Sequence, residues 1–167
     1  MVKMADLRSI LEGLGFDRPQ TLLQSGNVVF GAEGSAESLE HSLSMECEKR
    51  LGLSLGIHIR DLPSWQKIVL ANPFPATAES DPGHLLLTLL GQTLDTQVIE
   101  GLQAQVPGPE KIRGGDRCLY VTYPDGVGNS TIGKTPGWNK LTKDVTARNW
   151  NTVLKLLELA ERHAKSS

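Results

Sequence analysis

The sequence predicts an α+β protein made of two halves that share one order of elements. Apolar residues recur at helical spacing in several segments, and short alternating runs typical of strands lie between them. The small, polar stretch 76–83 has the composition of an exposed connector. We therefore expect a first domain over 1–75, a linker over 76–83 and a second domain over 84–167.

The first half begins with an amphipathic helix over residues 3–14, which glycines end. Two β-prone pieces, 21–24 and 27–30, flank the pair Ser25-Gly26, which is typical of a hairpin turn. Helix, strand and strand are thus expected in this order.

Ser35 is a favourable N-cap for the next helix, whose apolar face includes Cys47. Residues 55–60 alternate as a strand, and Pro63 then begins a helix that ends at 72–75. The order of the two halves matches if a strand preceded the first helix.

The second half reads strand, helix, strand, strand. The strands are expected over 85–90, 110–113 and 118–123, with the helix around 94–102. The C-terminal helix carries one apolar stripe from Trp150 to about His163. Its expected N-cap is Thr146, which places Arg148 in the first helical turn.

Composition limits the function classes. The 167 residues are 39% hydrophobic and 22% charged, so a wholly disordered or fibrous chain is excluded. The net charge of -2 gives no global attraction to nucleic acid or membranes. Without a membrane-length apolar run or an apolar signal core, we expect a soluble cytoplasmic protein with no membrane partner. Two cysteines predict neither a disulfide framework nor a zinc site.

Charge is unevenly distributed along the chain. Residues 1–83 hold 7 basic and 11 acidic side chains, whereas 84–167 hold 10 and 8. The range 111–155 holds eight basic side chains against three acidic ones, and Tyr120, Tyr123, Trp138 and Trp150 lie among them. A basic segment with interleaved aromatic residues is typical of nucleic-acid binding. Trp150 itself lies on the apolar stripe, which favours a place in the core.

Residues 128–135 match the phosphate-binding loop pattern, with Gly128, Gly133, Lys134 and Thr135 at its defining positions. Such a loop needs a helix that opens at the lysine, because helix N-H groups hold the phosphates. Pro136-Gly137 opposes a helix there. A nucleotide site and a glycine-rich surface loop are both possible interpretations, and the sequence favours the surface loop.

No catalytic or metal-binding constellation is evident. The possible nucleophiles are Ser25, Ser130 and Cys118, and the possible bases are His41, His58, His84 and His163. Because none of these residues are neighbours in sequence, we assign no catalytic residue, no metal and no cofactor.

Arg148 and Asn149, with Lys140 and Lys143 upstream, predict an anion pocket at the start of the last helix. A cation there opposes the helix dipole unless an anion or carboxylate lies beside it. The other interpretation is a clamp, in which Arg148 pairs with an acidic residue of the first half, and for Arg148 alone the sequence favours this clamp.

The sequence resembles the bacterial domain of unknown function 1697 (DUF1697) family. The segments that carry the resemblance are Lys3 to Arg8 with Leu14-Gly15-Phe16, Gln24 to Phe30, Asn72-Pro73-Phe74 and Thr146 to Leu156. The resemblance implies two ferredoxin-like subdomains, the first without its N-terminal strand, and no established activity or cofactor. Members usually begin with that strand, and their Ser-Lys-Leu-Thr box is Asn139-Lys140-Leu141-Thr142 here.

We therefore expect a non-catalytic binding domain for nucleic acid or another phosphate-bearing ligand. The expected site is a cleft between the lobes that gathers Ser25, Asn27, Lys140, Arg148 and Asn149. The alternative function is a nucleotide-binding phosphohydrolase that uses Lys134 and Thr135. An unfilled first-strand position also predicts self-association through the open sheet.

Overall fold

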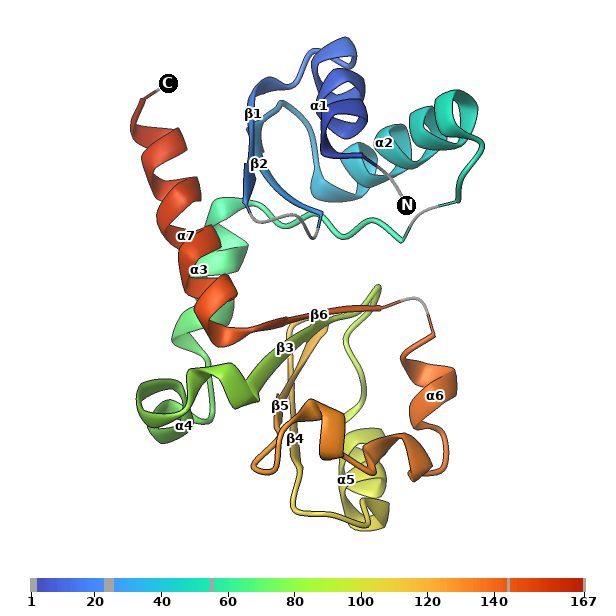
Figure 1. Ribbon diagram of the computed structural model, residues 1–167, viewed down its shortest axis with the longest axis vertical. Coiled ribbons are helices and arrows are strands. Elements are labelled where there is room, and N and C mark those ends of the chain that lie inside the picture. The colour runs from blue at the N-terminus through green and yellow to red at the C-terminus, as the bar shows by residue number, and fades with distance from the viewer. Residues whose placement is uncertain (1–2, 23–25, 55, 144, 167) are drawn as a thin grey trace. The chain divides into compact units, whose positions relative to one another are not determined.

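The computed structural model describes residues 3–22, 26–54, 56–143 and 145–166. Its contacts divide the chain into two units (Figure 1). The first unit comprises residues 1–65 and 155–167, and the second comprises 66–154. These limits differ from the domain boundaries expected from composition, because the C-terminal part of the last helix groups with the first unit.

The first unit contains two helices and a two-stranded antiparallel sheet. Its elements are α1 (Met4–Gly13), β1 (Asp17–Leu22), β2 (Asn27–Gly31) and α2 (Ala36–Leu51). The Ser35 Oγ accepts a hydrogen bond from Ser38 N at 3.1 Å and caps α2, as the sequence predicts. Helices α1 and α2 pack around Ile10, Leu11, Leu43 and Cys47.

The strand expected over 55–60 is wrong for the described residues 56–60, which are extended but belong to no strand. Ile57 and Ile59 still pack against the core of the first unit. Among the described residues no strand pairs with this segment, and the N-H of Ile59 instead donates to the Glu40 carboxylate at 2.6 Å.

Two helices contribute residues to both units. They are α3 (Leu62–Leu70) and α7 (Trp150–Lys165). Between α3 and the second sheet, the expected linker 76–83 overlaps two short elements. They are α4 (Pro75–Ser80), with Pro75 as its first residue, and the 3-10 turn η1 (Pro82–His84).

The second unit is a four-stranded antiparallel sheet with the strand order β4-β5-β3-β6. Its elements are β3 (Leu85–Leu89), α5 (Thr96–Gln105), β4 (Lys111–Gly115), β5 (Cys118–Thr122), α6 (Trp138–Leu141) and β6 (Thr146–Asn149). The 3-10 turns η2 (Val127–Asn129) and η3 (Ile132–Lys134) precede α6. This chain order and sheet order are those of a ferredoxin-like βαββαβ unit.

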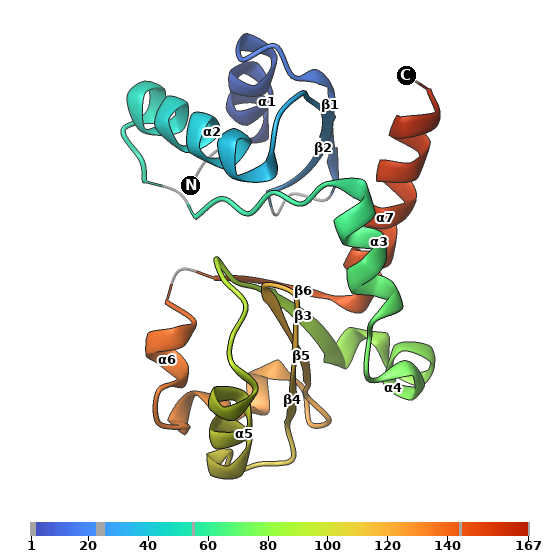
Figure 2. The same ribbon diagram turned by 180° about the vertical axis from the view of Figure 1, so that it is seen from behind.

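Helices α5 and α6 lie on one side of this sheet (Figures 1 and 2). The core there joins Ile99 and Leu102 of α5 and Trp138 of α6 to Ile112 and Val121 of the sheet. The fold class is therefore α+β. The second unit has the complete ferredoxin-like order, and the first has its helix-strand-strand-helix part without a strand before α1 among the described residues.

Candidate anion-binding surface

Arg148 lies on a strand rather than in the first turn of a helix, so the predicted N-cap at Thr146 is wrong. Residues 146–149 form β6, which pairs with β3 and sets Arg148 opposite Leu87. Pairing with a buried strand overrides the local capping preference of Thr146. Arg148 therefore does not oppose the dipole of a helix.

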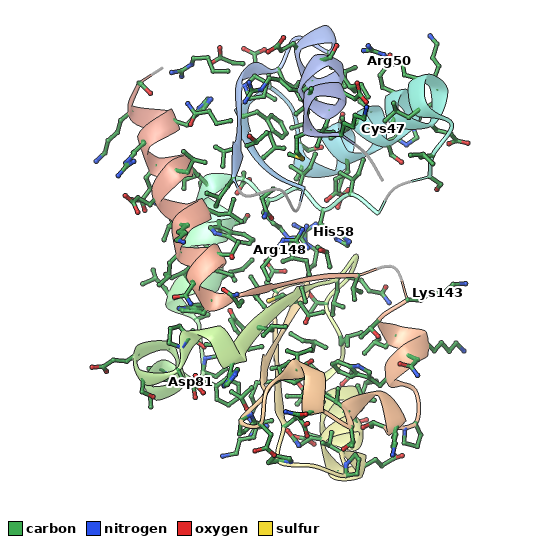
Figure 3. The ribbon with its side chains drawn as sticks, viewed as in Figure 1. Cys47, Arg50, His58, Asp81, Lys143 and Arg148 are labelled. Carbon is green, nitrogen blue, oxygen red and sulfur yellow. The ribbon has the colours of Figure 1, made fainter. Side chains whose placement is uncertain are left out.

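The half-buried Arg148 side chain folds along its own strand (Figure 3). Its Nη1 donates to Thr146 Oγ1 at 2.6 Å and to the Ala147 carbonyl at 2.8 Å. Burial lowers the pKa of the Arg148 guanidinium. The strand thus holds a partly desolvated positive charge in a fixed position.

Two of the expected ligand residues, Asn149 and Asn27, form hydrogen bonds within the fold. Asn149 Oδ1 accepts from Thr152 N at 3.1 Å, so Asn149 caps the helix α7 in place of Thr146. The buried Asn27 donates from Nδ2 to the Leu22 carbonyl at 3.3 Å across the hairpin. Ser25 lies outside the described residues.

Lys140 is exposed on α6, and two further exposed lysines lie near it in sequence. We call Lys134, Lys140 and Lys143 the lysine segment. A hydrogen bond of 3.1 Å from Asn139 Nδ2 to the Gly133 carbonyl joins α6 to η3, and Lys140 and Lys134 directly follow the two bonded residues. Lys143 follows α6 at the rim of the same unit (Figure 3).

The lysine segment lies in a stretch without acidic residues, which Asp125 and Asp144 border. Residues 126–143 contain no Asp or Glu. Within the described residues no lysine of this segment forms a salt bridge. Exposed lysines attract anions, so these three residues form a candidate cationic surface.

The loop that matches the phosphate-binding pattern in sequence does not have the backbone conformation of a phosphate-binding loop. Its residues form the two 3-10 turns, and the next helix begins only at Trp138, after Gly137 in the left-handed region with φ 85°. The Thr135 side chain is 3% exposed and lies inside the unit. The helix N-terminus on which a phosphate loop depends is therefore absent from residues 134–137, as Pro136-Gly137 indicates in the sequence.

The sequence did not single out Glu110, which holds this loop. Glu110 is 3% exposed, and Ser130 Oγ donates to its Oε1 at 2.5 Å. Ser130 in turn accepts from Ile132 N at 3.1 Å. No sequence signal marks Glu110, because a glutamate beside a lysine is most often a surface residue.

The other candidate nucleophiles and bases do not form a catalytic group. Cys118 is buried in β5, and burial raises the pKa of the buried Cys47 thiol on α2. His84 pairs with Asp81 at 2.8 Å, and His163 faces backbone carbonyls in the first unit. No group of three His, Cys, Asp or Glu side chains in the described parts of the chain is arranged to hold a metal.

The aromatic residues that alternate with basic ones in the sequence offer no stacking surface. Tyr120, Tyr123, Trp138 and Trp150 are all buried. The Tyr120 hydroxyl donates to the Ile68 carbonyl at 2.6 Å, and the Trp150 ring lies 6.3 Å from the Tyr120 ring. The prediction that Trp150 belongs to the core is confirmed.

The fold and this surface define an α+β protein with ferredoxin-like organisation and a candidate cationic surface. The chain belongs to the family described as "Protein of unknown function (DUF1697)", whose model matches residues 1–120. Its fold is similar to that of the conserved bacterial protein SP0830 from Streptococcus pneumoniae. The TM-score is 0.69 at 20% identity, over 96% of this chain and 90% of that chain. The comparison with curated proteins found no match.

Among the described helices none has the length and apolar character needed to cross a membrane.

Proposed function

We propose that this chain is a non-catalytic binding protein for a phosphate-bearing anionic partner, a nucleic acid, which contacts the lysine segment. The observation that carries the proposal is the acid-free range 126–143 with three exposed lysines that lack ion pairs in the described structure. Phosphate contacts release condensed counterions and supply most of the affinity in sequence-independent binding. Arg148 adds its charge from β6.

The aromatic residues indicate which contacts such a partner makes. None of the eight aromatic side chains of the chain is exposed. Bases of a single strand usually stack on exposed aromatic rings. Binding through charge alone favours the nucleic acid with the higher charge density, so we expect a duplex to bind more tightly than its separated strand.

Asn149 remains part of the proposed site. Its Oδ1 caps α7, and its amide nitrogen is the group that we expect to contact the partner. Ser25 and Asn27 belong to the first unit, and their part in binding stays a prediction.

The test is fluorescence anisotropy with a short labelled duplex and the matching single strand, at low and moderate salt. Two triple variants, each with three fewer positive charges, separate position from net charge. The site variant carries Lys134→Gln, Lys140→Gln and Lys143→Gln, and the control carries Lys3→Gln, Lys49→Gln and Lys165→Gln at exposed positions.

We expect the site variant to bind at least about tenfold more weakly than the parent. The slope of the logarithm of the binding constant against the logarithm of the salt concentration should become shallower by about one for each lysine that contacts a phosphate. The control should remain close to the parent. No binding by the parent at low salt, or an equal loss in both variants, would contradict the proposal.

The phosphohydrolase alternative is tested separately, because the loop match and the lysine segment share Lys134. Melting temperatures are compared with and without ATP or GTP and Mg²⁺, for the parent and for Lys134→Ala. We expect no shift in either protein, since no helix opens at Lys134. A nucleotide-dependent rise that Lys134→Ala removes would instead support the alternative.

A further inference from the structure

We propose that a side-chain clamp guards the edge strand β4 and so prevents its pairing with a strand from a second copy of the chain, and that a similar clamp occupies the backbone of residues 59–60 in the first unit. A strand edge exposes a row of N-H and C=O groups that pair readily with another chain. Each clamp consists of one helix side chain and one arginine, which together occupy the backbone groups of a single isoleucine.

The first clamp lies on β4, an edge strand of the four-stranded sheet. The Gln103 side chain of α5 accepts from Ile112 N at 2.6 Å and donates to the Glu110 carbonyl at 3.0 Å. A neighbouring strand would offer the same two bonds, one acceptor and one donor, along this edge. Gln103 therefore replaces one residue of a missing strand.

Arg113 completes the first clamp. Its Nη1 donates to the Ile112 carbonyl at 2.8 Å and to Gln103 Oε1 at 3.2 Å. The guanidinium also lies over the Phe74 ring, 5.9 Å from the centroid, which fixes its direction. Both backbone groups of Ile112 that face away from β5 are thus occupied.

The second clamp repeats this arrangement in the first unit. Glu40 Oε1 of α2 accepts from Ile59 N at 2.6 Å and lies 3.5 Å from Arg60 Nη1. Arg60 Nη1 donates to the Ile59 carbonyl at 3.0 Å. Both clamps join an Ile-Arg pair to a helix side chain that precedes it in the chain.

The two clamps have the same place in the chain order of their units. Helix α5 leads to the edge strand β4, and α2 leads to residues 56–60, which form no strand. Only the first clamp therefore lies on a sheet edge, and protection against strand pairing is proposed for that edge.

The first experiment measures self-association by sedimentation velocity, relative to the parent. The variant Gln103→Ala/Arg113→Thr removes the β4 clamp. The matched control Gln105→Ala/Lys111→Thr removes an amide from the same helix and a cation from the same strand, and neither side chain belongs to the clamp. Moderately high salt screens the remaining charges on β4.

We expect the clamp variant to associate at least about tenfold more strongly than the parent, with the control unchanged. A clamp variant that sediments like the parent, or a control that associates equally, would overturn the proposal.

The second experiment uses the parent protein and does not depend on whether a variant folds. The N-H of Gly114 points to the same side of β4 as that of Ile112, because strand residues alternate. Amide hydrogen exchange at Ile112 should be at least about tenfold slower than at Gly114. Equal exchange rates would show that Gln103 does not hold the edge in solution.

The clamp of the first unit has its own comparison. Glu40→Gln keeps the acceptor for Ile59 N and should preserve slow exchange there, whereas Glu40→Ala should lose it. Glu48→Ala, an exposed change on the same helix, is the control. Loss of slow exchange in Glu40→Gln and Glu40→Ala alike would overturn the clamp role of this side chain.

Discussion

Glu110 shows how one buried carboxyl group organises a loop. Its Oε1 receives the Ser130 hydroxyl, while its Oε2 has no hydrogen-bond partner in the described residues. A Cβ at position 108 would lie 2.5 Å from Oε2, so Gly108 allows the carboxyl group to fold against the backbone. This contact ties Ser130, within the loop 126–137, to the residue that precedes β4.

We expect Ser130→Ala to lower the free energy of unfolding by about 1 to 3 kcal/mol, since it leaves a buried polar group without its partner. Thr131→Ala, an exposed change in the same loop, should stay within about 0.5 kcal/mol of the parent. Urea denaturation measures both. Equal unfolding free energies for the two variants would show that the Glu110 contact does not hold the loop.

The two tyrosines of the chain predict that the stability of the fold falls at alkaline pH. Burial, and to a lesser extent the charge of Glu110, raises the pKa of Tyr123 from 10.0 to about 12, and burial also raises that of Tyr120. The folded state thus favours the protonated phenol. This contribution to stability is complete below pH 10 and is lost as the pH rises through about 12.

The loss attributable to Tyr123 is on the order of 2 kcal/mol. We expect little tyrosinate absorbance from the native protein at pH values where free tyrosine is half ionised, and a flatter pH dependence of unfolding for Tyr123→Phe. Ionisation of both tyrosines at their ordinary pKa without unfolding would contradict this prediction.

At the scale of the elements, the C-terminal part of α7 is tied to β1 within the first unit. His163 Nε2 lies 3.1 Å from the carbonyls of both Asp17 and Arg18, and it must carry a proton because carbonyls only accept. Arg18, which has a φ of 44°, donates from Nη2 to the His163 carbonyl at 3.2 Å. These bonds lie where the β1-β2 register shifts between Asp17 and Gln20.

We expect His163→Ala to lower the free energy of unfolding by about 2 kcal/mol, because a buried donor and its volume are lost. His163→Gln retains an N-H donor and should recover part of this loss. His41→Ala, at an exposed position, is the control. If chemical denaturation gave His163→Ala the same free energy of unfolding as His41→Ala, the contacts of His163 with the carbonyls would not stabilise the fold.

At the scale of the whole molecule, neither edge of the two-stranded sheet carries a clamp of this kind among the described residues, and the β2 edge is the one next to the expected first strand. β2 pairs with β1, and no other strand of the described chain pairs with it. Val28 and Phe30 pack on the core, so the alternating Val29 lies on the opposite face of the strand. This edge is the place where the sequence predicts self-association.

We therefore expect concentration-dependent association of the parent by sedimentation and light scattering. Val29→Lys adds a charge at the edge and should weaken this association at least about tenfold. Leu53→Lys, which replaces an exposed leucine outside the sheet, should have no effect. A parent that is monomeric at every concentration would contradict the prediction.

The candidate site stays a prediction. Lys140 and Lys143 are exposed and belong to the basic range that the charge pattern indicates, although Asp144 follows Lys143 directly. Arg148 is a strand residue, and Asn149 is a helix cap. Spacing along the chain shows where charges concentrate, but it does not show which polar groups are already occupied by backbone partners.

The sequence alone determined what depends on near neighbours. The capped helix after Ser35, the strands at Leu85 and Cys118, and the absence of a helix at Lys134 follow from local patterns and were confirmed. The tertiary structure decided what depends on partners distant in sequence. Residues 146–149 became a strand because β3 pairs with them, and Glu110 and Gln103 gained their roles from groups that only folding brings within hydrogen-bond distance.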